Sequence, residues 1–185
     1  MKHIYTLILL LMPLLAVSQE VSIKTNALYW TVGTINLGTE IGLGKRVSFD
    51  LLATYNPFEF KEDLKIKHWS VNPDFRFWLC EKFSGHFFGL GAIYAQYNMA
   101  GIPFPGYSWA KDSRYQGWAV AASLTYGYQW AISKRWNMEA VVGVGYVYAV
   151  YDKYKKGKCG DFLDNDKEHL ILPTKLALTF IYIIK

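Results

Sequence analysis

The feature that most constrains the fold is an alternation of apolar residues with small or polar ones, repeated along nearly the whole chain. Between Trp118 and Trp130, one parity carries Trp, Val, Ala, Leu and Tyr, and the other carries Ala, Ser, Thr, Gly and Gln. A period of two residues is that of a β-strand, whose successive side chains point to opposite faces. The same pattern recurs from Trp136 to Tyr148 and from Lys175 to Ile184. We therefore expect an all-β chain.

Eight segments of this kind can be recognised. Each has room for the roughly 9 to 11 residues that a tilted membrane-spanning strand needs, and their number is even, as in bacterial barrels. They are Ile23 to Thr31, Ile35 to Gly44, Val47 to Asn56, Trp69 to Leu79, Phe87 to Met99, and the segments that begin at Trp118, Trp136 and Lys175.

The connections between these segments alternate in length. Residues 44–46, 81–86 and 132–135 are short, whereas 57–67, 100–116 and 152–168 are long, and only the first connection, 32–34, departs from this order. Bacterial outer-membrane barrels have short periplasmic turns and longer outer loops. Because each unpaired backbone group costs several kcal/mol in hydrocarbon, such a sheet must close on itself. We predict an eight-stranded antiparallel transmembrane β-barrel.

The N-terminus is typical of an exported protein. Lys2 and His3 precede an apolar stretch from Ile4 to Val17, which ends in the small-residue site Ala16-Val17-Ser18. Residues 1–18 are therefore predicted to be a cleaved signal peptide, and residues 19–185 an outer-membrane barrel domain. No segment offers the roughly 20 apolar residues of a membrane-spanning helix, which argues against a helical membrane protein.

Composition agrees with a membrane location. Aromatic residues make up 17% of the chain, and Tyr and Trp accumulate at the two water boundaries of a bilayer. We therefore expect outer-membrane lipid as a partner. The net charge of +5 is scattered along the chain rather than gathered in one stripe, so nucleic acid is not an expected partner.

If the apolar rows face lipid, the opposite parity points charged side chains into the lumen. The interior of an eight-stranded barrel is just wide enough to be filled by side chains, and an unpaired charge there is costly. We expect these residues to form an ion-pair network that fills the lumen, with a proton or ion path as the alternative. They are Lys24, Glu40, Asp50, Asp74, Arg76, Glu139 and Lys175.

Catalytic and metal-binding patterns are weak. His68 and Ser70 share one face of a strand, which suggests a lipid-modifying hydrolase, but no orienting acid can be identified. His68 and His169 are far apart in the sequence and do not form a metal-ligand pattern. We expect no enzymatic activity, no cofactor and no metal, and keep the hydrolase as an alternative.

Cys80 is predicted at the periplasmic end of its strand and Cys159 in an outer loop. A hydrocarbon layer of about 30 Å would separate them, whereas a disulfide needs Cα atoms within about 7 Å. We expect two free thiols.

One outer loop is a candidate partner-binding surface. Its aromatic residues Phe104, Tyr107 and Trp109 are accompanied by two prolines, and exposed aromatic groups of this kind mark interaction sites. The alternative is that these rings fold over the barrel mouth or lie in the headgroup layer.

Seven segments together form a recognisable pattern: Lys24 to Tyr29, Asn36 to Gly38, Tyr55 to Pro57, Phe77 to Phe83, Gly85 to Gly89, Tyr94 to Asn98 and Pro173 to Lys175. With them the chain resembles an uncharacterised family of outer-membrane proteins from Bacteroides-like bacteria that carries a domain of unknown function (DUF3575). The resemblance extends from about Lys24 to the C-terminus and implies a barrel, often encoded beside fimbrial genes, with no established activity.

These observations together indicate a non-enzymatic outer-membrane barrel that acts as an anchor, an assembly partner or a surface binding module, with a surface or fimbrial protein as its expected partner. A soluble lipocalin-like barrel is the structural alternative. It would invert the faces, so that the apolar rows line a ligand cavity and the polar rows face water. The polar rows are dominated by Gly, Ala, Ser and Thr, which favours the membrane.

Overall fold

Nearly all of the described chain is β-strand. The computed structural model describes residues 20–61, 64–101, 113–155 and 160–184. The strands are β1 (Val21–Asn26), β2 (Ile35–Gly42), β3 (Val47–Asn56), β4 (Glu59–Lys61), β5 (Leu64–Trp78), β6 (Gly85–Ala100), β7 (Ser113–Ala131), β8 (Trp136–Lys155) and β9 (Phe162–Ile183), and a helix α2 (Ala27–Thr31) follows β1.

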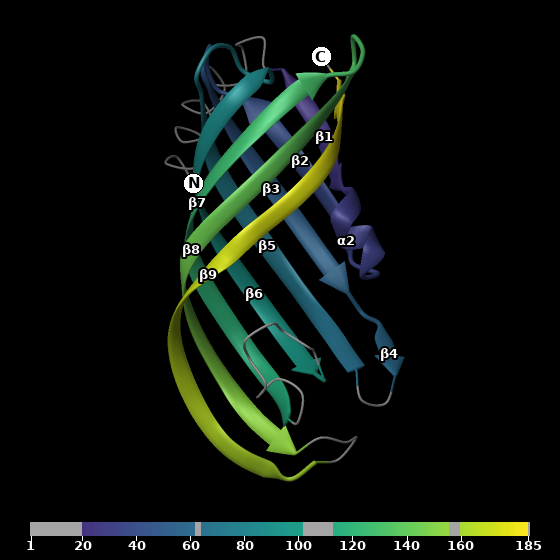
Figure 1. Cartoon of the computed structure of the whole chain (residues 1–185), viewed down its shortest axis with the longest axis vertical. Helices are drawn as coiled ribbons and strands as arrows, with labels where there is room; N and C mark the ends of the chain where they lie inside the picture. Colours follow the sequence, from purple (N-terminus) through teal and green to yellow (C-terminus); the bar gives the residue numbers. More distant parts are fainter. Residues whose placement is uncertain (1–19, 62–63, 102–112, 156–159, 185) are drawn as a thin grey trace, which may run out of the picture.

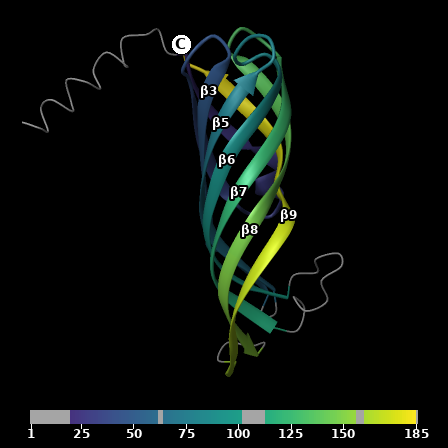
Figure 2. The ribbon, with the colours of Figure 1, turned by 90° about the vertical axis from the view of Figure 1, so that its left-hand side faces the viewer.

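Eight of the strands close into a ring (Figure 1). Each strand pairs antiparallel with its neighbour in the chain, β3 pairs with β5, and the first strand β1 pairs with the last strand β9. The short β4 adds only a hairpin to β5. Figure 2 shows β5 to β9 side by side along one wall. The predicted all-β fold with eight antiparallel strands is confirmed.

The distribution of side chains is inverted relative to a water-soluble domain. Among the described residues, buried polar and charged side chains outnumber buried hydrophobic ones about two to one, while large apolar side chains such as Leu37, Leu124, Val142 and Leu176 are exposed. The apolar rows therefore face outward and the polar rows line the lumen. The lipocalin-like alternative is wrong, because it needs the apolar rows inside.

The strands are longer than predicted at one end of the barrel. The short turns 43–46, 79–84 and 132–135 lie at the other end, which we call the short-turn end (top of Figure 1). At the opposite, long-loop end, β8 continues to Lys155 and β9 begins at Phe162 rather than at Lys175. Apolar residues there do not alternate with polar ones, since the charged run 164–168 is followed by Leu170, Ile171 and Leu172 in succession, but the backbone ladder between β8 and β9 continues.

The predicted C-terminal bound of the first strand is wrong. It was expected to run to Thr31, but the chain leaves the sheet at Asn26 and forms α2. The Asn26 side chain caps this helix by accepting a hydrogen bond from the Leu28 amide at 3.1 Å. Gly33, with φ of 69°, then turns the chain back into β2. No helix in the described part of the chain is long and apolar enough to cross a membrane.

Asparagine side chains fill the place in the wall where β1 stops. Asn26 Oδ1 accepts from the Leu178 amide at 3.2 Å, and Asn26 Nδ2 donates to Leu176 O at 3.4 Å. The Asn36 side chain bonds both backbone groups of Asn26, at 2.6 and 3.0 Å, and Asn56 Nδ2 donates to Val32 O at 3.0 Å. These side chains replace ladder bonds and hold α2 against β9, β2 and β3. We call this place the seam.

Replacing Asn26 with Ala should lower the free energy of unfolding by about 1 to 3 kcal/mol, because it leaves buried backbone groups without partners. Urea titration followed by tryptophan fluorescence measures this change. Asn165→Ala is the matched control, since Asn165 is exposed and bonds Asp152 on the surface. Equal unfolding midpoints for the two variants would contradict the role of the seam.

Candidate functional site

The structure brings all seven predicted lumenal charges into one cluster. They come from six strands: Lys24 from β1, Glu40 from β2, Asp50 from β3, Asp74 and Arg76 from β5, Glu139 from β8 and Lys175 from β9. The strand register explains the convergence, because Glu40 lies opposite Asp50 and Asp50 lies opposite Asp74. Side chains directly opposite on one face are neighbours across the strands.

Arg76 is the centre of this cluster and is fully buried. Its Nη1 lies 3.0 Å from Glu40 Oε2 and 2.8 Å from Glu139 Oε2, and its Nη2 lies 2.9 Å from Asp50 Oδ2. The guanidinium also lies over the Phe87 ring, 4.6 Å from its centroid. The planar guanidinium, with its five donors, can serve several carboxylates at once.

Lys24 bridges the same three carboxylates. Its Nζ lies 2.6 Å from Glu40, 3.2 Å from Asp50 and 3.1 Å from Glu139. The Ser48 hydroxyl donates to Glu40 Oε1 and accepts from Trp78 Nε1. Each charge therefore has its orientation set by more than one neighbour.

Asp74 and Lys175 form the flank of the cluster toward the long-loop end. Lys175 Nζ lies 3.2 Å from Asp74 Oδ2, and Thr125 Oγ1 donates to the same oxygen at 3.2 Å. Asp74 Oδ1 has no hydrogen-bond partner among the described residues. Asp74 lines a small cavity of about 20 Å³, together with Tyr29 and Ser123 among others. This volume accommodates one water molecule.

The cluster holds three cations and four carboxylates, so its formal charge is −1. Desolvation of a buried charge is compensated only where partners surround it closely. The central contacts of 2.6 to 3.2 Å around Lys24 and Arg76 meet this requirement. The arrangement fills the lumen and ties six strands together, as expected for a network of ion pairs inside a small barrel.

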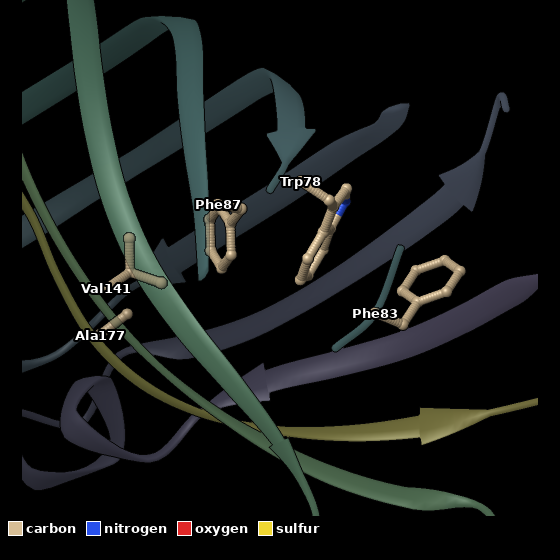
Figure 3. Packing of buried hydrophobic residues seen from close by; sticks show 5 residues of the cluster. All are labelled: Trp78, Phe83, Phe87, Val141 and Ala177. Atoms are coloured by element: carbon tan, nitrogen blue, oxygen red, sulfur yellow. The ribbon is translucent and has the colours of Figure 1, made fainter. Parts of the chain in front are cut away.

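An apolar group closes the lumen at the short-turn end, next to the charges (Figure 3). Its buried residues are Trp78, Phe83, Phe87, Val141 and Ala177, with Trp78 between Phe83 and Phe87. Phe83 belongs to the turn after β5, has φ of 62°, and accepts a hydrogen bond at its carbonyl from Asn137 Nδ2. We call this group the aromatic stopper. It was not predicted from the sequence, although Phe87 has the same parity as Gly89, which indicates that its ring faces the lumen.

His68 and Ser70 both face inward, as predicted, but they have different partners. His68 Nδ1 lies 3.1 Å from Ile66 O, whereas Ser70 Oγ bonds Thr54 Oγ1 at 2.7 Å and Asn72 Nδ2 at 3.2 Å. No hydrogen bond joins His68 to Ser70 in the part of the chain that the structure describes. Contacts among the described residues thus do not assemble the nucleophile and base of the hydrolase alternative.

The remaining predicted residues are dispersed. His169 faces outward and its Nδ1 lies 2.6 Å from the Tyr146 hydroxyl, so it lies on the opposite face from His68. Within the described ranges, no group of three or more potential metal ligands occurs. Cys80 is an exposed free thiol near the short-turn end. Cys159 and the loop residues Phe104, Tyr107 and Trp109 lie outside the described residues.

Comparison with known proteins gives a family. The model of the family described as "Protein of unknown function (DUF3575)" matches residues 4–184. The chain belongs to this family. No curated protein and no solved structure matches it. Three of the segments that carry the DUF3575 resemblance, Lys24 to Tyr29, Asn36 to Gly38 and Tyr55 to Pro57, meet at the seam, where Asn26, Asn36 and Asn56 hold α2.

Replacing Arg76 with Met should lower the free energy of unfolding by about 3 to 5 kcal/mol, because the buried carboxylates lose their central partner. A second change, Glu139→Gln, should restore part of that loss by removing one of the uncompensated charges. Urea titration measures both. The control Arg135→Met, at an exposed arginine in a short turn, should stay within about 0.5 kcal/mol of the native chain. A purely steric role for Arg76 would show no recovery in the double variant.

Replacing Gly89 with Ala should destabilise the barrel by about 1 to 3 kcal/mol, because the added methyl group overpacks the lumen. It would collide with Thr125 Oγ1 and lie 2.6 Å from Asp74 Oδ1. Gly44→Ala is the matched control, since a methyl group there meets nothing within 4 Å. Thermal unfolding compares the two, and similar midpoints would show that Asp74 moves without cost.

Proposed function

We propose that this chain is an outer-membrane β-barrel without enzymatic activity, which serves as an anchor, an assembly partner or a surface binding module. The observation that supports this most is the outward face of the barrel. Rows of exposed apolar side chains, among them Val120, Leu124 and Val142, cover the wall between two belts of aromatic residues. Such a band between aromatic girdles is typical of transmembrane barrels.

The two belts have the composition expected at the boundaries of a bilayer. The outer girdle, toward the long-loop end, consists of Trp69, Tyr94, Trp118 and Tyr148, which contact one another in pairs at 5.4 and 5.9 Å between ring centroids. The inner girdle, toward the short-turn end, consists of Tyr128, Trp130, Trp136 and Tyr182, paired at 6.0 and 5.1 Å. Tyr and Trp favour such boundaries, because each combines an apolar ring with a hydrogen-bonding edge.

The spacing of the girdles matches an outer membrane. Along β7 (Ser113–Ala131), ten residues separate Trp118 from Tyr128. At about 3.3 Å per residue and a tilt of about 40°, this corresponds to about 25 Å along the barrel axis, the height of the apolar band in transmembrane barrels. Ion pairs and the aromatic stopper fill the part of the lumen nearer the short-turn end, which favours an anchor over a channel.

Beyond the outer girdle, the outward positions become polar. Gln116 and Asp152 lie on neighbouring strands there, and Asn165 and Lys167 follow on β9. The strands therefore continue past the proposed membrane as a rigid, water-facing extension. Recognition sites on barrels lie on such outer parts, and the family resemblance suggests a fimbrial or other surface protein as the partner.

Fractionation of cells that express the full chain should recover it in the outer membrane. Boiled and unboiled samples should migrate differently on a gel, because the closed hydrogen-bonded ring resists detergent until it is heated. Recovery as a soluble periplasmic protein would overturn the proposal.

The same purified protein, inserted in a planar bilayer, should show no ion conductance, because side chains fill its lumen. A steady conductance after insertion would favour an ion path through the charge network instead. Arg76→Met provides the comparison, since it removes the central side chain of that network.

A further inference from the structure

A groove of about 560 Å³ crosses the wall of the barrel at the height of the outer girdle. Outward residues of β3, β5, β6, β7 and β8 form most of its lining, and the inward residues Asn56, His68, Tyr97 and Gly117 contribute the rest together with Pro57. The outward residues used below are Tyr55, Trp69, Gln96, Asn98, Gln116 and Trp118. This size is within the usual range of small-ligand sites.

A glycine lies beneath this groove. Gly117 faces the lumen between Gln116 and Trp118, and a methyl group there would collide with Val150 O and lie 2.7 Å from Tyr151 Cα. Only glycine permits β7 and β8 to approach so closely at this point. Gln116 and Trp118, on either side of Gly117 in β7, share the outward face because successive side chains of a strand alternate.

The groove has one apolar and one polar side. Trp69 and Trp118 form the side toward the apolar band, and their side chains are 39% and 37% exposed. Asn98 and Gln116 lie two residues farther out on the neighbouring strands β6 and β7, where they face each other. The exposed indole of Trp118 therefore lies beside the amide side chains of Asn98 and Gln116.

Hydrogen bonds fix the polar groups in place. Trp69 Nε1 donates to Gln96 Oε1 at 3.1 Å, and Gln96 Nε2 donates to the Tyr94 hydroxyl at 2.9 Å. Asn98 Nδ2 donates to Gln116 Oε1 at 3.4 Å. Asn98 Oδ1, however, is a buried acceptor with no hydrogen-bond partner among the described residues. A rotation of the Asn98 amide would bring this oxygen into the groove, where a ligand hydroxyl can donate to it.

The charged side chains that line the groove are Lys67 and Asp152, one of each sign. Lys67 Nζ lies 2.6 Å from Glu59 Oε1, and the hydrogen bond from Lys67 is the main cause of a lowered pKa of the Glu59 carboxyl. Lys65 Nζ lies 3.5 Å from the same oxygen. A lining with one charge of each sign favours a neutral, hydroxyl-rich ligand over a phosphate or a metal ion.

We propose that this groove binds the saccharide headgroup of an outer-leaflet glycolipid; the proposal rests on the membrane location proposed above. Indole rings pack against the apolar faces of sugar rings, while amide groups bond sugar hydroxyls. The groove borders the apolar band directly, so acyl chains attached to the headgroup continue along the wall beside Trp69 and Trp118. This continuity favours a membrane glycolipid over a free sugar.

The test uses the full chain in vesicles of phosphatidylethanolamine and phosphatidylglycerol, with and without a neutral glycolipid, monoglucosyl diacylglycerol. After mild detergent extraction and purification, mass spectrometry counts the glycolipid molecules retained per protein. The variant Trp69→Phe/Trp118→Phe/Gln116→Ala should retain about tenfold less than the native chain. Trp130→Phe/Trp136→Phe, which changes two indoles of the inner girdle, is the matched control and should retain the native amount.

The outcomes separate this inference from the proposed function. A heat-dependent gel shift shows whether the protein has inserted into each kind of vesicle. If it inserts into both and the two variants retain equal amounts of glycolipid, glycolipid binding by the groove is overturned and the membrane location is not. Failure to insert into either kind would overturn both. Binding of the free saccharide, without its acyl chains, as tight as that of the intact glycolipid would overturn the assignment to a membrane glycolipid.

Discussion

The pairing of β1 with β9 is the constraint on which the rest of the structure depends. Five residue pairs, from Ser22 opposite Ile183 to Asn26 opposite Thr179, close the ring between the two ends of the chain. A ring of eight strands has an interior that its own side chains must fill. Because the apolar rows face outward, the filling is polar, and it is stable only where the charges lie in mutual contact. The Arg76-centred cluster is the consequence of closure.

The side chains that fill the lumen change in type along the barrel axis, as the proposed anchor with a recognition surface requires. The aromatic stopper around Trp78 and Phe87 lies at the short-turn end, the ion pairs follow, and hydroxyl and amide side chains such as Thr54 and Ser70 lie beyond them. The outward face changes at a corresponding height from apolar to polar. The seam is the exception in the wall, where asparagine side chains and a short helix take the place of a ladder.

Much of the barrel could be predicted from local patterns, and what could not depends on contacts between distant segments. A period of two residues is local, so the parity of Lys24 or Glu139 is visible in the sequence and places both in the lumen. The helix α2 is not visible in the sequence, because Ala27 to Trp30 form a short apolar run that a strand can also contain. Only the capping by Asn26, with its bonds to Asn36 and β9, turns this run out of the sheet. The outer parts of β8 and β9 were not predicted because apolar and polar residues do not alternate there. The groove requires the register of four strands at once.

The closure described above also sets an order of events for folding. Lys24 and Glu139, which meet in the cluster, are 115 residues apart in the chain, and Lys175 arrives only with the final strand. The carboxylates of β3 and β5, Asp50 and Asp74, therefore lack part of their neutralising partners until the C-terminal strand has joined the ring. Folds dominated by such distant pairings form slowly, and the last strand to be synthesised completes both the wall and its electrostatic core.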